Sequence, residues 1–320
     1  MTPETLGKGA ADVFAGRFFL VSYLPTLALS LFVLVLVRAG APGEQIDLGA
    51  AWRAAARLDA GEITLLVLAV TLAALVSHPL QLPLVRLLEG YWPAALRPVR
   101  ALGVRRQTRL RDRLEAEANR LDESMTDAEI QAAGTAGTRL RRLFPPTDRL
   151  LPTALGNALA ATEHRAGAGY GWDAVVAWPR LYPVLGAPLR AVVDDRRNTL
   201  DVTVRLAATA FMAGAATVAL LSRSGWWLLL ALGPLALSWI CYRQAVGAAV
   251  AFGEAVETAF DLHRFDLLRA LHLPLPAGRS QEQAQAREVC GYWRQGMPVA
   301  FAYEHAAEDR PVPAPDGRAV

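Results

Sequence analysis

The sequence from residue 190 to residue 260 reads RAVVDDRRNTLDVTVRLAATAFMAGAATVALL (190–221), SRSG (222–225) and WWLLLALGPLALSWICYRQAVGAAVAFGEAVETAF (226–260). Two long segments with apolar middles flank a short polar tip, so the pattern predicts a helical hairpin over 190–273. At 1.5 Å per residue the two arms would be roughly 48 and 70 Å long, whereas the hydrocarbon core of a bilayer is about 30 Å thick. We therefore expect both arms to cross a membrane, at 202–221 and 226–242, and to extend beyond it as a helical stalk.

The composition supports a membrane class. Of the 320 residues, 53% are hydrophobic and the mean hydropathy is +0.24, which is more apolar than an ordinary soluble domain. The net charge is +3, and Lys8 is the only lysine in an alanine- and arginine-rich chain, a composition typical of a bacterium with a high-GC genome. Cys241 and Cys290 fit neither a disulfide framework nor a zinc spacing, so we expect two plain thiols and no cofactor.

A first transmembrane hairpin is predicted over 18–92, after a cytoplasmic segment at 1–17. Its first span, 18–37, is uncharged and has the length that one crossing needs. A signal peptide cleaved after residues 39–41 is the alternative, but the apolar run is long for one and Arg38 lies before the cleavage site. The second span, 63–85, contains two prolines near its end.

Arginine placement sets the orientation. Eighteen arginines lie between Arg86 and Arg197, whereas the loop at 38–62 has three and the tip has one. Because short loops rich in arginine stay on the cytoplasmic side, we expect 93–189 to be a cytoplasmic helical region. With four spans both termini are cytoplasmic, and 274–320 holds a C-terminal helix and a disordered tail. The expected fold is thus all-α, a multi-pass protein of the bacterial inner membrane.

His78 and Gln81 are the candidate polar residues at membrane depth. An ionisable group inside a membrane helix is a functional hypothesis by default. The structural alternative, which we favour, is that His78 caps backbone carbonyls freed by the neighbouring prolines.

A charged stripe is the sharpest pattern in the chain. Its members alternate in sign at steps of 4, 3, 4 and 4 and so share one helical face. They are Arg190, Asp194, Arg197, Asp201 and Arg205. The stripe forms either solvated intrahelical pairs or, as the functional alternative, a polar seam between subunits or the lining of a charged vestibule.

Local signals predict the cytoplasmic elements. Residues 97–120 favour an amphipathic helix with Arg111 and Glu115 as an i,i+4 pair, and TDAE at 126–129 matches a capping box. A helix is expected at 153–165, followed by an aromatic and proline-rich stretch that packs as short helical turns.

Three carboxylates share a face of the second hairpin arm. Glu254, Glu257 and Asp261 could bind a divalent cation, but no ExxH motif accompanies them. Pairing with arginines of the 97–120 helix is the simpler interpretation. That helix mixes acids with its arginines and has no stacking aromatics, so no nucleic-acid partner is expected.

No catalytic or cofactor motif is present, and we expect the protein not to be an enzyme. The order of two spans, a helical cytoplasmic segment, two further spans and a helical tail is similar to that of bestrophin-type anion channels. The similarity concerns topology, and no site residue is carried over from that family.

Two functions therefore stay open. The favoured one is an oligomeric, channel-like pore lined by the second span, with His78 and Gln81, or by the small residues of the third, above an anion-favouring vestibule. The alternative is a membrane-anchored scaffold whose cytoplasmic helices bind a protein partner.

Overall fold

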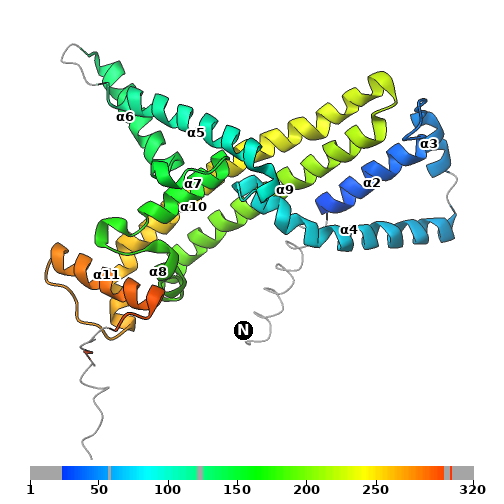
Figure 1. Cartoon of the computed structure of the whole chain (residues 1–320). Helices are drawn as coiled ribbons and strands as arrows, with labels where there is room; N and C mark the ends of the chain where they lie inside the picture. The colour runs from blue at the N-terminus through cyan, green and yellow to red at the C-terminus, as the bar shows by residue number, and fades with distance from the viewer. Residues whose placement is uncertain (1–23, 57–58, 121–124, 299–302, 305–320) are drawn as a thin grey trace, which may run out of the picture. The chain divides into compact units, whose positions relative to one another are not determined.

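The structure, a computed structural model, describes residues 24–56, 59–120, 125–298 and 303–304. These residues form helices and connecting segments with no strand among them, which confirms the all-α class (Figure 1). The α-helices are α2 (Leu24–Arg38), α3 (Leu48–Ala55), α4 (Ala60–Glu89), α5 (Arg97–Ala118), α6 (Asp127–Leu143), α7 (Ala154–Arg165), α8 (Ala174–Leu181), α9 (Ala187–Leu221), α10 (Leu232–Ala270) and α11 (Arg279–Gln295). Short 3-10 helices are η2 (Ala94–Leu96), η3 (Thr147–Arg149), η4 (Ala168–Tyr170), η5 (Tyr182–Val184) and η6 (Gly225–Ala231).

The predicted hairpin is formed by α9 and α10, with the expected tip between them. Its second arm starts as the 3-10 helix η6, and Pro234 lies in the first turn of α10. Proline is tolerated there because the backbone N–H groups of a first turn have no partner inside the helix.

The chain divides into two compact units, each described by itself. Unit 1 comprises residues 1–160 and 195–252, and unit 2 comprises residues 161–194 and 253–320.

In unit 1, α9 and α10 lie side by side (Figure 1). Small residues lie at their contact. A Cβ added at Gly214 would lie 2.5 Å from Leu235 Cδ2, so the contact leaves room only for glycine. The Ser238 hydroxyl donates a hydrogen bond to the Ala207 carbonyl at 2.9 Å. Small residues and interhelical hydroxyl bonds are the usual means of joining helices in membranes.

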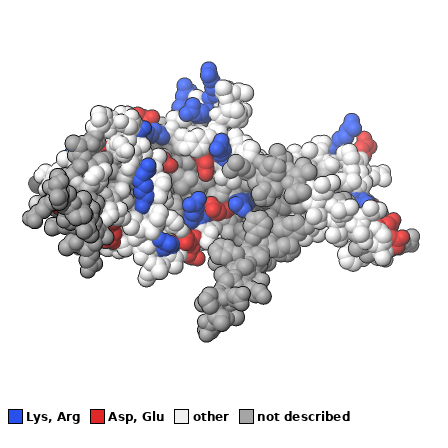
Figure 2. All heavy atoms as spheres, turned by 90° about the horizontal axis from the view of Figure 1, so that it is seen from below, with Lys and Arg blue, Asp and Glu red and all other residues white. Residues whose placement is uncertain are grey.

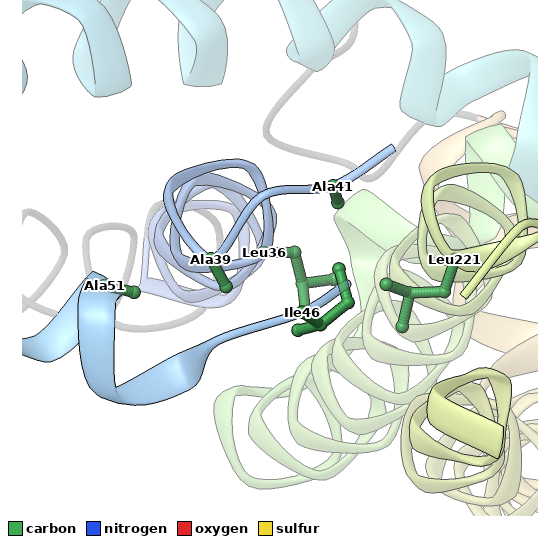
Figure 3. Packing of buried hydrophobic residues seen from close by; sticks show 6 residues of the cluster. All are labelled: Leu36, Ala39, Ala41, Ile46, Ala51 and Leu221. Carbon is green, nitrogen blue, oxygen red and sulfur yellow. The ribbon is translucent and has the colours of Figure 1, made fainter. Parts of the chain in front are cut away.

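One hydrophobic cluster of unit 1 joins the first loop to the hairpin tip. Figure 3 shows Leu36 and Ile46, from either side of the loop after α2, lying toward Leu221 at the end of α9. Nearby, the Ser224 hydroxyl donates a hydrogen bond to the Gly43 carbonyl at 2.7 Å. The loop after α2 and the tip after α9 are therefore at the same end of unit 1. We call the hydrophobic cluster that contains Leu36, Ile46 and Leu221 the tip cluster.

A second cluster lies midway along α9 and α10, where α7 and α4 pack against them. Leu155 of α7 is buried among Leu200 and Val204 of α9 and Ala245 of α10, and Val85 of α4 packs against this group. We call it the stalk cluster. Along α9, Val204 and Leu221 are 17 residues apart, which corresponds to about 26 Å of helix.

Between these clusters unit 1 exposes large apolar side chains. Leu68 of α4 is 63% exposed, and Leu229 and Trp239 of the second arm are 63% and 61% exposed. Two helical segments in the described part of the chain are long and apolar enough to cross a membrane, Ala187–Leu221 and Gly225–Ala270. The helices α2 and α4, on which the first two predicted spans fall, are only partly described.

Unit 2 has an aromatic core. Phe260 of α10 is fully buried and lies 6.4 Å, between ring centroids, from Trp178 of α8. Trp172 is 3% exposed and stacks on Trp293 of α11 with centroids 6.0 Å apart. Gly167 adopts a φ of +73°, and a Cβ there would meet Phe260 at 2.8 Å. This glycine thus ends α7 and also lets the chain pass over the core, as the predicted helix stop requires.

Candidate functional site

The main cavity of unit 2 has a volume of about 680 Å³ and a charged lining. Three arginines and three acids face it, from α7, α10 and the start of α11. They are Arg165, Arg264, Arg279, Glu257, Asp261 and Glu282. Because the formal charges cancel, the cavity suits a group that presents both signs of charge more than a simple anion.

Two of the arginines are held by carboxylates inside the cavity. The Arg264 Nε donates to Glu282 Oε1 at 2.7 Å, and these side chains are 17% and 9% exposed. Arg165 donates from Nε to Glu257 Oε1 at 3.1 Å and also pairs through its terminal nitrogen. Both pairs link distant parts of the chain, so they fix the walls of the cavity.

Arg264 is also held between aromatic rings. Its guanidinium carbon lies 4.0 Å from the centre of the Tyr170 ring and 4.4 Å from that of Phe265. The Tyr170 hydroxyl donates to Asp261 Oδ1 at 2.8 Å. This hydrogen bond, with burial and the Asp261 charge, raises the pKa of Tyr170 above its ordinary value. Tyr170 is therefore a neutral hydrogen-bond donor at physiological pH.

Arg279 is the exposed cation of the cavity. It is the first residue of α11, and one terminal nitrogen lies 3.5 Å from the Gly169 carbonyl. Gly278, which precedes it, is the N-cap of α11 and makes no side-chain cap bond. A ligand entering the cavity would thus meet Arg279 before the paired charges.

Beside the cavity, Asp173 joins α8 to α11. Its backbone N–H donates to Cys290 Sγ at 3.3 Å, and its carboxylate pairs with Arg294. Burial raises the pKa of the Cys290 thiol to about 11. Cys290 is therefore an unreactive thiol, in line with the expectation from sequence.

Two of the three carboxylates predicted from sequence, Glu257 and Asp261, line this cavity, but with partners other than the expected ones. We expected Glu254, Glu257 and Asp261 to pair with the 97–120 helix, and this was wrong for two of them. Glu257 pairs with Arg165 of α7, and Asp261 accepts a hydrogen bond from Tyr170. Within the described residues no group of three potential metal ligands comes together.

The charged stripe lies on α9, and its first two members have partners in the loop before the helix. Asp194 accepts a hydrogen bond from the Tyr182 hydroxyl at 2.6 Å. Arg190 donates to the Pro183 carbonyl at 2.5 Å, and its guanidinium lies over the Tyr182 ring. Arg197 and Asp201 are exposed and Arg205 is half-buried. The first two members of the stripe thus contact residues outside α9.

His78 and Gln81 lie within α4, which continues as helix through both prolines. Their side chains are outside the described part of the structure, so their roles stay predictions.

Sequence reasoning missed Arg264, Glu282 and Tyr170. Arg264 and Glu282 are 18 residues apart, and Tyr170 is 91 residues from Asp261. A weak signal was present, because Tyr170 lies in a glycine-rich segment shortly after the expected helix at 153–165. On the face in Figure 2, blue and red side chains lie next to one another in several places, so charges of both signs are mixed there.

Compared with protein-family models, curated proteins and solved structures, the chain shows no significant match. Inferences about function therefore rest on its own geometry.

Proposed function

We propose that this chain is a four-span membrane protein whose unit 2 is a cytoplasmic docking module for a protein partner. It would act as a membrane-anchored scaffold with no catalytic role. The spans are the predicted ones, and residues 93–189 and both termini face the cytoplasm. The observation that carries the docking role is the charge-balanced cavity of unit 2.

The two clusters of unit 1 support the four-span arrangement. Four spans require the loop after α2 and the tip after α9 to be on one side, and in the tip cluster Leu36 packs with Leu221. They also require the end of α4 to be level with the cytoplasmic ends of the third and fourth spans, and in the stalk cluster Val85 packs with Val204 of α9 and Ala245 of α10. The separation of about 26 Å along α9 is close to the thickness of a bilayer core, about 30 Å.

The exposed surface of α10 favours lipid over a protein interior. A buried core helix of a soluble protein passes the same test of length and hydropathy, but its side chains are covered. In the apolar window of the second arm only 6% of the residues are buried. Large apolar areas exposed in this way usually mark a membrane or a protein interface.

Cysteine labelling in whole cells tests the topology. In a background without Cys241 and Cys290, Arg223→Cys at the tip should react with a membrane-impermeant maleimide. Arg139→Cys on α6 should react only after the membrane is permeabilised. Labelling of both positions in intact cells, or of neither, would overturn the four-span proposal.

The cavity of unit 2 fits a charged peptide segment. The charges of Arg264, Glu282 and Glu257 are already paired within the cavity. Removing water from these pairs when a partner binds therefore costs little additional free energy. The exposed guanidinium of Arg279 is available to an acidic group of the partner. Because the pairs are preformed, ordering them adds little to the cost of binding.

Photo-crosslinking tests the docking role. A photoreactive residue in place of Ala277, which lines the cavity, should give one defined protein adduct in cells. Arg279→Glu should abolish the adduct, whereas Arg287→Glu, exposed on the same helix outside the cavity lining, should retain it. An adduct that survives Arg279→Glu, or no adduct, would contradict docking at this cavity.

The channel remains the second proposal, and the described structure bears on one of its forms. Ala207 and Gly214 of α9 contact α10 within the same chain, which favours a pore lined by the second span over one lined by the small residues of the third. A pore would then depend on His78 and Gln81 of α4. The subunit count in lipid nanodiscs decides between the proposals. A closed ring of four or more, with flux altered by His78→Ala, would favour the channel, and a monomer or dimer would exclude an axial pore.

A further inference from the structure

A second cavity lies in unit 1, where α4 ends and α5 begins. Its volume is about 600 Å³. The lining combines aromatic and apolar side chains with two arginines and, among its described residues, no acid. It consists of Pro83, Arg86, Leu87, Gly90, Tyr91, Trp92, Pro93, Arg100 and Leu151.

The two arginines are exposed and have no ion pair or hydrogen-bond partner among the described side chains. In the cavity of unit 2, by contrast, Arg165 and Arg264 are held by carboxylates. Two guanidinium groups facing one hollow repel each other unless an anion lies between them. The lining therefore favours a ligand with negative charge.

The turn at the end of α4, which follows Arg86, is held by several hydrogen bonds. Gly90 has a φ of +98°, and its N–H and that of Tyr91 bond to the Leu87 and Arg86 carbonyls, a Schellman end of α4. The Trp92 indole Nε1 donates to the Leu87 carbonyl at 2.7 Å. Arg86 thus projects from a fixed helix end, and the Trp92 ring is oriented in the cavity wall.

The opposite wall is equally fixed. Leu151 is clamped by the fully buried Asn157, which accepts from the Leu151 N–H at 2.7 Å and donates to its carbonyl at 3.0 Å. A Cβ at Gly156 would overlap the Glu89 carbonyl oxygen, so α7 touches the end of α4 backbone to backbone. The hollow is therefore a built feature of unit 1.

Its position matches the level of lipid headgroups. The cavity begins where the uncharged run of 63–85 ends, and Arg86 is the first charge after that run. Tyr91 and Trp92 follow, and such residues mark the interface between bilayer and water. The charges that come next on α5 are all arginines up to Arg109, a distribution typical of segments near anionic lipid.

We propose that this cavity binds the phosphate of an anionic phospholipid, with Arg86 and Arg100 holding the phosphate oxygens and Trp92 and Leu87 contacting the glycerol and upper acyl chain. The guanidinium fork suits phosphate oxygens, and the apolar part of the lining suits a lipid more than free phosphate. The inference rests on the proposed membrane placement of α4. It goes beyond the docking role of unit 2, because it concerns a different site and ligand.

Native mass spectrometry of the full chain in detergent tests the site. Phosphatidylglycerol and phosphatidylcholine are titrated separately, and wild type should bind phosphatidylglycerol selectively. Each of Arg86→Gln and Arg100→Gln should weaken phosphatidylglycerol binding about fivefold, and the double variant about 25-fold, because one basic residue near a lipid surface contributes about that factor. Arg109→Gln, an exposed arginine of α5 outside the lining, is the matched control and should bind like wild type.

The outcomes separate the sources of phosphate. Equal binding of the two lipids, or no loss in the double variant, would overturn the proposal. Displacement of phosphatidylglycerol by millimolar inorganic phosphate would show a free-phosphate site and overturn the lipid assignment. Thermal unfolding in detergent without added lipid should be unchanged by the double variant, because neither arginine has a described partner to lose. If carbonate washing extracts the protein from membranes without detergent, the topology fails, independently of the lipid result.

Discussion

The helices α9 and α10 run through both units, but their surroundings in the two units differ. In unit 1 the second arm exposes Leu229 and Trp239, and the helices meet through small residues such as Gly214. In unit 2 the same α10 buries Phe260 completely and pairs its acids and Arg264. One part of the helix has the surface expected in lipid, and the other has the surface expected in water. A continuous helix such as α10 can therefore be stabilised by close approach to a neighbouring helix in one part and by hydrophobic burial in the other.

The largest expected effect tests the apolar side of this comparison. Phe260→Ala should lower the free energy of unfolding of unit 2 by about 4 kcal/mol, because it opens a cavity in a closed core. Leu229→Ala, in the exposed surface of unit 1, should change stability in detergent by less than about 0.5 kcal/mol, because detergent covers that surface in both forms. Chemical denaturation in a mild detergent, followed by tryptophan fluorescence, measures both. A large loss for Leu229→Ala would show that protein, not lipid, covers this surface.

The charge pairs give the next largest effect. Glu282→Gln should cost about 3 kcal/mol, because Arg264 would keep its charge at a site where it is 17% exposed. Asp47→Asn removes a partner of Arg53 in a pair whose side chains are 63% and 65% exposed. It should cost less than about 0.5 kcal/mol.

Salt separates the two pairs further. Raising the salt concentration to 1 M should reduce the small Asp47 effect and leave most of the Glu282 effect, because exposed charges are screened more strongly. Equal costs in the two variants would contradict the view that unit 2 depends on desolvated charge.

The thiol of Cys290 tests burial chemically. With a pKa of about 11, compared with an ordinary value of 9.0, its thiolate fraction at pH 7.5 is reduced about 100-fold. In a Cys241→Ser background, reaction with a small maleimide should therefore be at least about 100-fold slower than for a free cysteine. The rate should rise about tenfold per pH unit while the fold persists, because each unit raises the thiolate fraction tenfold. Rapid labelling at pH 7.5 would mean that α11 opens away from Asp173.

Local signals were enough to predict much of the fold. The capping box at Thr126 and Glu129 is present, α7 ends before Gly167, and the Arg111–Glu115 pair forms as its spacing indicates. These features depend on residues within a few positions of one another, which a sequence displays directly. The hairpin was predicted for the same reason.

The site was harder to predict, because its residues meet only after folding. Glu257 was expected to find an arginine, which was right in chemistry and wrong in partner, since Arg165 lies 92 residues away in the chain. No periodicity relates Tyr170 to Asp261 or Arg264 to Glu282.

The smallest effects concern how a helix begins in each unit. In unit 1, Thr126 accepts from the Glu129 N–H, and Thr126→Ala should cost α6 about 1 kcal/mol, or about fivefold in hydrogen-exchange protection of its first turn. In unit 2, Gly278 precedes α11 without a side-chain cap, its backbone is extended, and a Cβ there would meet nothing within 4 Å. Gly278→Ser should therefore supply the missing cap and raise protection of the first turn about twofold, since serine exceeds glycine at an N-cap by only a few tenths of a kcal/mol. Hydrogen exchange read by mass spectrometry measures both changes, and Gly134→Ala within α6 is a control that alters propensity but no cap. If Gly278→Ser instead lowers protection, the start of α11 is constrained by something that the cap disturbs, and the entrance beside Arg279 is less open than its exposure indicates.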